Sequence, residues 1–238
     1  MKSTWVLAIG LVLTATAPPV ASSAGLMVHV PFDGAIADTR GLGAVRADQV
    51  GTPTFITGPD GEAALPGPGS RHVAMLHVSR LSRLLLRGRT PEAGTIMLWV
   101  KRPDPALAPA DTAPVLVLSS DAPLNLDVAL GGAPPRLVAA FDDEAGLRHE
   151  TALPLPAAAA AGSWVHLALG WDAGAGTTVA FVQGEALENA TGKPFVMPKL
   201  PGVFALGAAD TPIDDFRLYD RLLDAAAVRA LPGFPASH

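Results

Sequence analysis

The sequence lacks cysteine altogether and has few aromatic or charged side chains. None of its 238 residues is Cys, one is Tyr, and charged residues make up 16%. Without cysteine the chain has no disulfide, no thiolate nucleophile and no zinc-thiolate site, so its stability must come from a packed core. The net charge of −5 gives no overall attraction to nucleic acid or to an anionic membrane, which argues against a general nucleic-acid binder.

The first 24 residues have the pattern of an export signal. Lys2 precedes an apolar run from Trp5 to Leu13, and the small residues Ser22 and Ala24 stand before Gly25. The apolar run is too short for a membrane-spanning helix, which needs about 20 residues. We therefore expect residues 1–24 to be a signal peptide and residues 25–238 to form one secreted domain, either periplasmic or extracellular.

Glycine and proline are abundant, with 24 and 23 residues, which is typical of short strands joined by many turns. Apolar runs recur at intervals near ten residues. We expect strands at 26–32, 73–78, 94–101, 115–119, 124–130, 136–141, 147–152, 163–171, 177–182, 203–206 and 213–219. One helix is expected from Ala225 to Leu231, capped by Asp224. The pattern predicts an all-β antiparallel sandwich with one short C-terminal helix.

Four segments, taken in order, resemble the laminin-G-like branch of the concanavalin A-like lectin/glucanase superfamily. They are Phe32-Asp-Gly-Ala-Ile-Ala-Asp-Thr-Arg-Gly41, Gly94-Thr-Ile-Met-Leu-Trp-Val-Lys-Arg102, Ser163-Trp-Val-His-Leu-Ala-Leu-Gly-Trp-Asp172 and Ile213-Asp-Asp-Phe-Arg-Leu-Tyr-Asp-Arg-Leu-Leu-Asp224. The resemblance implies a two-sheet antiparallel jelly-roll sandwich, commonly a binding or adhesive module on exported proteins, sometimes with a calcium ion.

Two positions depart from the family pattern. At the end of a hairpin, where the family usually has Tyr-x-Asp-Gly, this chain has Phe181-Val-Gln-Gly184, so an amide replaces an acid. Pro212 stands where a glycine commonly precedes the Ile-Asp pair. Both changes put a ligand built around those loops in doubt.

The aspartates near the first and last strands are candidate metal ligands. Strand alternation places Asp214 on the apolar face with Phe216 and Leu218, and Asp215 with Arg217. A buried carboxylate must be hydrogen-bonded, paired or metal-bound. The resemblance brings the first and last strands together, so Asp38, Asp214 and Asp215 are predicted to bind Ca²⁺ with loop carbonyls and water. The alternative is that these carboxylates cap loop amides or pair with arginine.

A basic segment is the second candidate site. Residues 71–102 hold seven Lys or Arg and one acid, Glu92. We expect either solvated strand edges or a basic face for an anionic ligand. On the second interpretation Arg83, Arg87 and Arg89 are ligand-binding residues.

No motif for catalysis is found. The paired acids of jelly-roll glucanases, Glu-x-Asp-x-x-Glu, do not occur, nor does Gly-x-Ser-x-Gly or a phosphate-binding loop. Trp99, Trp164 and Trp171 lie in strands with apolar faces, and we expect them in the core rather than in a sugar-stacking platform.

The sequence thus predicts an exported, non-catalytic binding module for a carbohydrate or a cell-surface ligand. The alternative is a structural or adhesive envelope protein that binds a protein partner. A glycoside-active enzyme is the third and least supported interpretation.

Overall fold

The computed structural model describes residues 24–39, 46–70, 72–77, 91–102, 113–118, 126–131, 136–142, 145–146, 148–155, 162–196, 203–207 and 210–231. The predicted signal peptide, apart from Ala24, and the segment with Arg83, Arg87 and Arg89 lie outside these residues.

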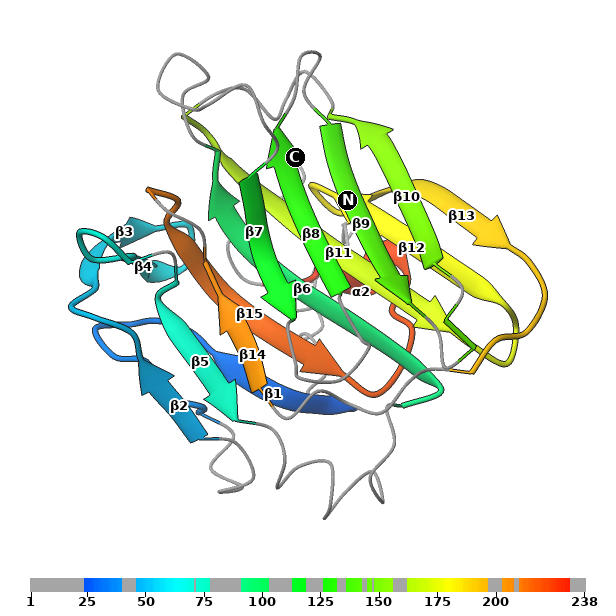
Figure 1. Ribbon diagram of the computed structural model, residues 1–238, viewed down its shortest axis with the longest axis horizontal. Helices are drawn as coiled ribbons and strands as arrows, with labels where there is room; N and C mark the ends of the chain where they lie inside the picture. Colours follow the sequence, from blue (N-terminus) through cyan, green and yellow to red (C-terminus); the bar gives the residue numbers. More distant parts are fainter. Residues whose placement is uncertain are drawn as a thin grey trace, which may run out of the picture.

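Two antiparallel sheets form a sandwich, as the sequence predicts (Figure 1). The eight-stranded sheet has the order β13-β12-β11-β6-β15-β4-β3, with β1 also paired to β15. Its strands are β1 (Leu26–Val30), β3 (Thr54–Gly58), β4 (Gly61–Leu65), β6 (Ala93–Lys101), β11 (Trp164–Asp172), β12 (Thr177–Val182), β13 (Glu185–Thr191) and β15 (Ile213–Tyr219).

The seven-stranded sheet has the order β10-β9-β8-β7-β14-β5-β2. Its strands are β2 (Arg46–Gln49), β5 (Ala74–His77), β7 (Ala113–Leu118), β8 (Leu126–Gly131), β9 (Arg136–Asp142), β10 (Arg148–Pro154) and β14 (Val203–Leu206). The strand order is that of a two-sheet antiparallel sandwich, as expected for a jelly roll.

The main core lies between the sheets. Alternate residues of β11, namely Val165, Leu167, Leu169 and Trp171, point into it together with Ile96, Leu98 and Val100 of β6. The neighbouring residues of these strands consequently point to the outer face of the eight-stranded sheet.

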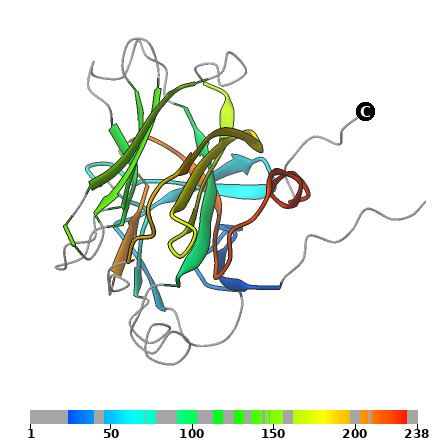
Figure 2. The same cartoon turned by 90° about the vertical axis from the view of Figure 1, so that its right-hand side faces the viewer.

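A second, smaller core covers part of that outer face. The helix α2 (Ala225–Arg229) packs Val228, with Leu223 and Leu231, over Met97, Phe181 and Tyr219. Figure 2 shows the two layers from the side, with α2 outside the sheet. Asp224 caps the helix as predicted, because its carboxylate accepts a hydrogen bond from the Ala227 amide. None of the described helices is long and apolar enough to cross a membrane.

Candidate functional site

The outer face of the eight-stranded sheet holds most of the buried polar groups of the described residues. These are Thr95, His166, Asp214, Asp215 and Arg217, all less than a tenth exposed. The described groups with clearly shifted pKa values also gather here; they are Asp60, His166, Asp214, Asp215 and Arg217. Shifted pKa values concentrate at functional sites, so this region is the candidate site.

A β-bulge in β15 places the acids. Asp214 pairs with Trp99 and Arg217 with Met97, so two residues, Asp215 and Phe216, stand opposite the single residue between those partners. Asp215 adopts the left-handed conformation with φ of 50°. The predicted alternation is therefore wrong at Asp214, which shares the outer face with Arg217 while Phe216 lies in the core.

Asp215 has two hydrogen-bond partners. Its Oδ1 accepts hydrogen bonds from His29 Nε2 at 2.7 Å and from Arg217 Nε at 2.8 Å. Burial raises the pKa of Asp215, but the His29 hydrogen bond and the Arg217 charge outweigh it, so the pKa lies below its ordinary value. The other imidazole nitrogen of His29, Nδ1, lies 2.9 Å from the Thr39 hydroxyl. This contact links β1 to the loop that follows it.

Asp214 has a different environment. Its side chain is fully buried, its Oδ2 accepts a hydrogen bond from the Asp60 amide at 3.3 Å, and its Oδ1 has no partner within hydrogen-bond geometry, although the neighbouring Asp215 amide also lowers its pKa. Burial raises its pKa to about 7; the Asp60 amide opposes this shift, and the negative charges of Asp215 and Asp33 reinforce it.

The β3–β4 hairpin lies against this carboxylate. A Cβ on Gly58 would stand 2.4 Å from Asp214 Oδ2, so only glycine allows the close approach. On the next strand the Glu62 amide donates to Asp33 Oδ1 at 2.8 Å. Two carboxylates, one from the loop after β1 and one from β15, thus hold the hairpin.

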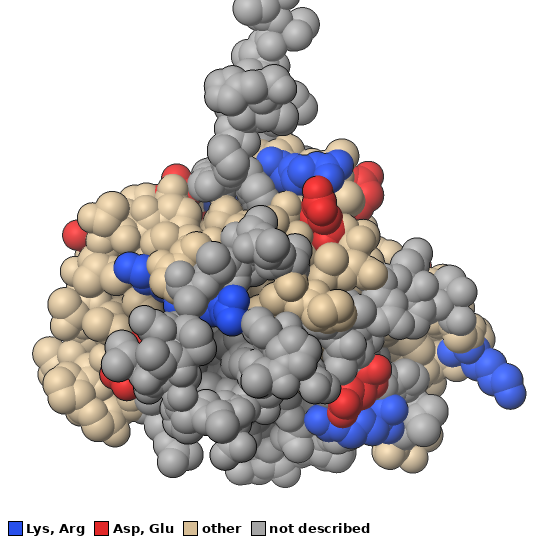
Figure 3. Space-filling model, turned by 90° about the horizontal axis from the view of Figure 1, so that it is seen from above, with Lys and Arg blue, Asp and Glu red and all other residues tan. Residues whose placement is uncertain are grey.

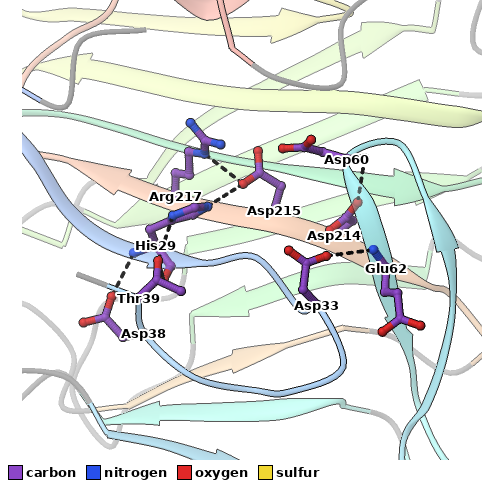
Figure 4. Close-up of polar contacts among 9 residues, drawn as sticks. All are labelled: His29, Asp33, Asp38, Thr39, Asp60, Glu62, Asp214, Asp215 and Arg217. Atoms are coloured by element: carbon purple, nitrogen blue, oxygen red, sulfur yellow. Dashed lines mark hydrogen bonds and ion pairs between the residues drawn. The ribbon is translucent and has the colours of Figure 1, made fainter. Parts of the chain in front are cut away.

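We call Asp33, Asp60, Asp214 and Asp215 the carboxylate cluster. Figure 4 shows Asp60, Asp214 and Asp33 close together, Asp215 with Arg217 and His29 on one side of them, and Asp38 farther away beside Thr39. Burial and the charges of Asp215 and Asp33 raise the pKa of Asp60 above its ordinary value. Asp33 and Asp60 were not predicted from the sequence. A polar hairpin turn gives no sequence signal that it folds over an aspartate 154 residues away.

The three predicted calcium ligands do not form one ligand set. Asp214 and Asp215 are neighbours in the chain, but Asp215 already accepts hydrogen bonds from Arg217 and His29. Asp38 Oδ1 accepts a hydrogen bond from the backbone amide of His29 at 3.1 Å. Among the residues that the structure describes, no three His, Asp or Glu side chains are arranged to hold a metal ion. The orphaned, buried Oδ1 of Asp214 is the one feature here that suits a hard cation.

Next to the carboxylate cluster, the outer face carries the aromatic rings of Trp99 on β6 and His166 on β11. His166 stands edge-on to Trp99, with ring centroids 5.0 Å apart, and burial lowers the pKa of His166 to about 3, so it is neutral. Trp99 and Trp171 are buried, as predicted, whereas Trp164 is only half-buried.

On the face drawn in Figure 3, the charged side chains of the described residues do not form one extended patch. Seen from above in Figure 3, basic and acidic side chains are interspersed in small groups. The predicted ligand-binding residues Arg83, Arg87 and Arg89 are not among the described residues, so their role stays a prediction.

Comparison with known proteins points to one superfamily. The family model described as concanavalin A-like lectin/glucanases superfamily matches residues 80–229. No curated protein sequence matches the chain.

Solved structures share the fold at low sequence identity. The binding domain of paraclostridial mosquitocidal protein 1 is 12% identical with a TM-score of 0.66; the match covers 86% of this chain and 51% of that one. The receptor-binding domain of botulinum neurotoxin D gives the same values. The chain therefore spans about half the length of these toxin domains.

Another similar structure has nearly the size of this chain's fold. Domain 4 of an extracellular arabinanase from Geobacillus stearothermophilus, solved in complex with arabinotriose, is 20% identical with a TM-score of 0.59. The match covers 86% of this chain and 97% of that domain.

Proposed function

Because the chain belongs to the concanavalin A-like lectin/glucanases superfamily, we propose that it is an exported, non-catalytic binding module that recognises a carbohydrate or a cell-surface ligand. The observation that carries this proposal is the similarity to a domain solved with arabinotriose, of which the match covers 97%. The toxin domains are named as binding or receptor-binding domains, which supports the same class of function.

The state of the buried acids supports a non-catalytic module. A retaining glycosidase needs two carboxyl groups about 5 Å apart that reach the substrate. Asp214 is fully buried, and Asp215 is 3% exposed and paired with Arg217 and His29. These carboxylates hold the hairpin and the bulge, and they do not offer an acid and a nucleophile to a sugar.

The test is binding of purified residues 25–238 to a broad glycan array, in calcium and in chelator. Saturable binding to a defined glycan is the expected result. Absence of binding in both conditions, together with co-purification of one envelope protein, would overturn the carbohydrate proposal and favour a structural or adhesive module.

We propose Asp214 as the carboxylate ligand of a calcium ion, with Asp38 and Asp215 outside its coordination sphere. Its orphaned Oδ1 supports this assignment, and carbonyl oxygens and water would complete the shell of six to eight oxygens that Ca²⁺ takes. A bound calcium would offset negative charge in the carboxylate cluster and stabilise the folded state by an amount that grows with the logarithm of the calcium concentration above its Kd.

Thermal unfolding with and without calcium tests the assignment. Calcium should raise the Tm of the natural protein and of Asp38→Asn, but not that of Asp214→Asn. Equal Tm values for the natural protein in calcium and in chelator would contradict it, as would loss of the calcium effect in Asp38→Asn.

The basic segment gives a separate proposal, in which Arg83, Arg87 and Arg89 bind an anionic glycan or an acidic partner. Guanidinium groups bind carboxylate and sulfate oxygens in pairs, which supports this chemistry. Retention on heparin should fall when all three are replaced by Gln. Unchanged retention in that variant would remove the proposal.

A further inference from the structure

The first strand begins where the expected signal peptide ends. Ser22 and Ala24 are the small residues at positions −3 and −1 of a signal-peptidase site, so the sequence places the cut between Ala24 and Gly25. Strand β1 starts at Leu26, and Ala24 is exposed. The sequence pattern and the start of the first strand therefore agree on one boundary.

Gly25 is fixed to the end of the last strand. The Asp220 amide donates a hydrogen bond to the Gly25 carbonyl at 2.9 Å, and the next residue, Leu26, pairs with Tyr219 of β15. Gly25 has a φ of 76°, a left-handed conformation that residues with a Cβ rarely adopt. The residue at which the mature chain is expected to start is thus held in place by the fold.

The Asp220 carboxylate also lies beside Gly25. A Cβ on Gly25 would stand 2.5 Å from Asp220 Oδ1. The backbone nitrogen and such a Cβ are bonded to the same Cα and lie about 2.5 Å apart, so the Gly25 nitrogen is at most about 5 Å from Asp220 Oδ1. In the uncut chain this nitrogen belongs to an uncharged peptide group.

Cleavage would place a positive charge at this nitrogen. Water adds across the bond between Ala24 and Gly25, the carboxylate stays on Ala24, and the amine of Gly25 is an ammonium group at neutral pH. A carboxylate at this distance attracts the ammonium and favours its protonated form. Arg221 opposes the attraction in part, because its Cδ would lie 3.3 Å from the same Cβ position.

We propose that the chain is cut between Ala24 and Gly25 on export, and that the new Gly25 ammonium forms an ion pair with Asp220 that fastens β1 to the end of β15. This inference rests on the export that the proposed function includes, and it adds a processing site and a role for the new terminus. The carboxylate cluster and the bound ligand take no part in it.

The first experiment locates the cut. The full chain is expressed in a bacterial host, and the intact mass of the exported protein is measured; we expect the mass of residues 25–238. Gly25→Ala should be cut at the same bond, because Ser22 and Ala24 are unchanged. It should nevertheless have a lower Tm, because the added Cβ meets Asp220 Oδ1 and the positive φ is strained.

The second experiment measures the pKa of the Gly25 amine in the processed protein, from the pH dependence of its acetylation rate. Asp220→Asn should lower this pKa by about 0.5 or more at low salt. Glu185→Gln, at an exposed acid on β13 at the opposite edge of the sheet, is the matched control and should leave it unchanged. Asp220 is exposed, so about 1 M salt should shrink the effect of Asp220→Asn.

The outcomes separate this inference from the proposed function. Export of a protein that begins at any residue other than Gly25 would overturn the inference and leave the binding module intact. Equal amine pKa values in the natural protein and in Asp220→Asn, with both folded in urea unfolding, would overturn the ion pair. Retention of the chain inside the cell would overturn export and the inference together. A cut before Gly25 in a protein that binds no glycan would support the inference and overturn the carbohydrate proposal alone.

Discussion

Asp215 and Arg217 form a buried ion pair on β15, with side chains 3% and 8% exposed and a distance of 2.8 Å between Oδ1 and Nε. Burial lowers the pKa of Arg217, and the charge and hydrogen bond of Asp215 more than restore it, so both groups are ionised. Two charges taken out of water stabilise the fold only while both are present, because a lone one keeps the full cost of desolvation.

Replacement of Arg217 by Met should therefore destabilise the protein by about 3–5 kcal/mol in urea unfolding. His29 would remain as a hydrogen-bond partner of Asp215 Oδ1. The double variant with Asp215→Asn should recover most of the loss, since no uncompensated charge then remains. Arg46→Met is the matched control, because its ion pair with Asp48 is exposed at 71% and 45% and should be worth at most about 1 kcal/mol. Equal effects of Arg217→Met and Arg46→Met would contradict this account.

At the scale of elements, the last strand and the segment after it organise the outer face. β15 pairs with β6 on one side and with β4 and β1 on the other, and its bulge turns Asp214 toward the β3–β4 hairpin. The Thr95 hydroxyl then ties the segment before α2 to the sheet, because it donates to the Arg221 carbonyl and accepts the Leu223 amide. The helix thereby lies over the apolar half of the face and leaves the polar half to the carboxylate cluster and Trp164.

The N-cap of this helix gives a prediction at the same scale. Asp224→Ala removes the acceptor for the Ala227 amide at 2.7 Å and should destabilise the protein by about 1 kcal/mol. Urea unfolding measures the loss, and Glu92→Ala, at an exposed acid without a capping role, should leave stability nearly unchanged. A loss no larger than that of Glu92→Ala would contradict a stabilising role of this cap.

At the scale of the whole molecule, two buried groups give the stability opposite dependences on pH. Burial lowers the pKa of His166 from 6.5 to about 3. Its contribution to the free energy of unfolding is therefore present above pH 6.5 and is lost as the pH falls. Burial raises the pKa of Asp214 from 3.8 to about 7. Its contribution to the free energy of unfolding is therefore present below pH 3.8 and is lost as the pH rises. Each slope is about 1.4 kcal/mol per pH unit, and the two oppose each other between pH 4 and pH 6.5.

Single variants should separate the two slopes in urea unfolding in the presence of chelator. In Asp214→Asn the His166 slope remains, so stability should fall relative to the natural protein as the pH is lowered from about 6.5 to 4. In His166→Gln the Asp214 slope remains, so stability should fall as the pH is raised over the same interval. Other acids, including Asp33, Asp60 and Asp215, are present in all three proteins. Parallel pH profiles in the three proteins would contradict the assignment.

The sequence by itself determined what depends on local pattern. Alternation and turn residues predict the strands at 94–101, 163–171 and 213–219, and the cap at Asp224 predicts the helix, because each signal lies within a few residues of the element it specifies. The motif order was enough to predict the jelly roll. The strands β2, β4 and β13 were missed because their small, polar or helix-favouring residues carry no strand pattern of their own. The strand β3 was missed although its Thr, Phe and Ile residues favour strands.

Tertiary structure alone decided the site. The bulge moves Asp214 to the face opposite the one that alternation predicts, and only the docked hairpin brings Asp60 and Asp33 to it. Likewise, Trp99 and Trp164 lie in similar apolar runs, but Trp99 is buried and Trp164 is half-buried. Register, bulges and exposure arise from contacts between strands far apart in the chain, so local residue patterns do not encode them.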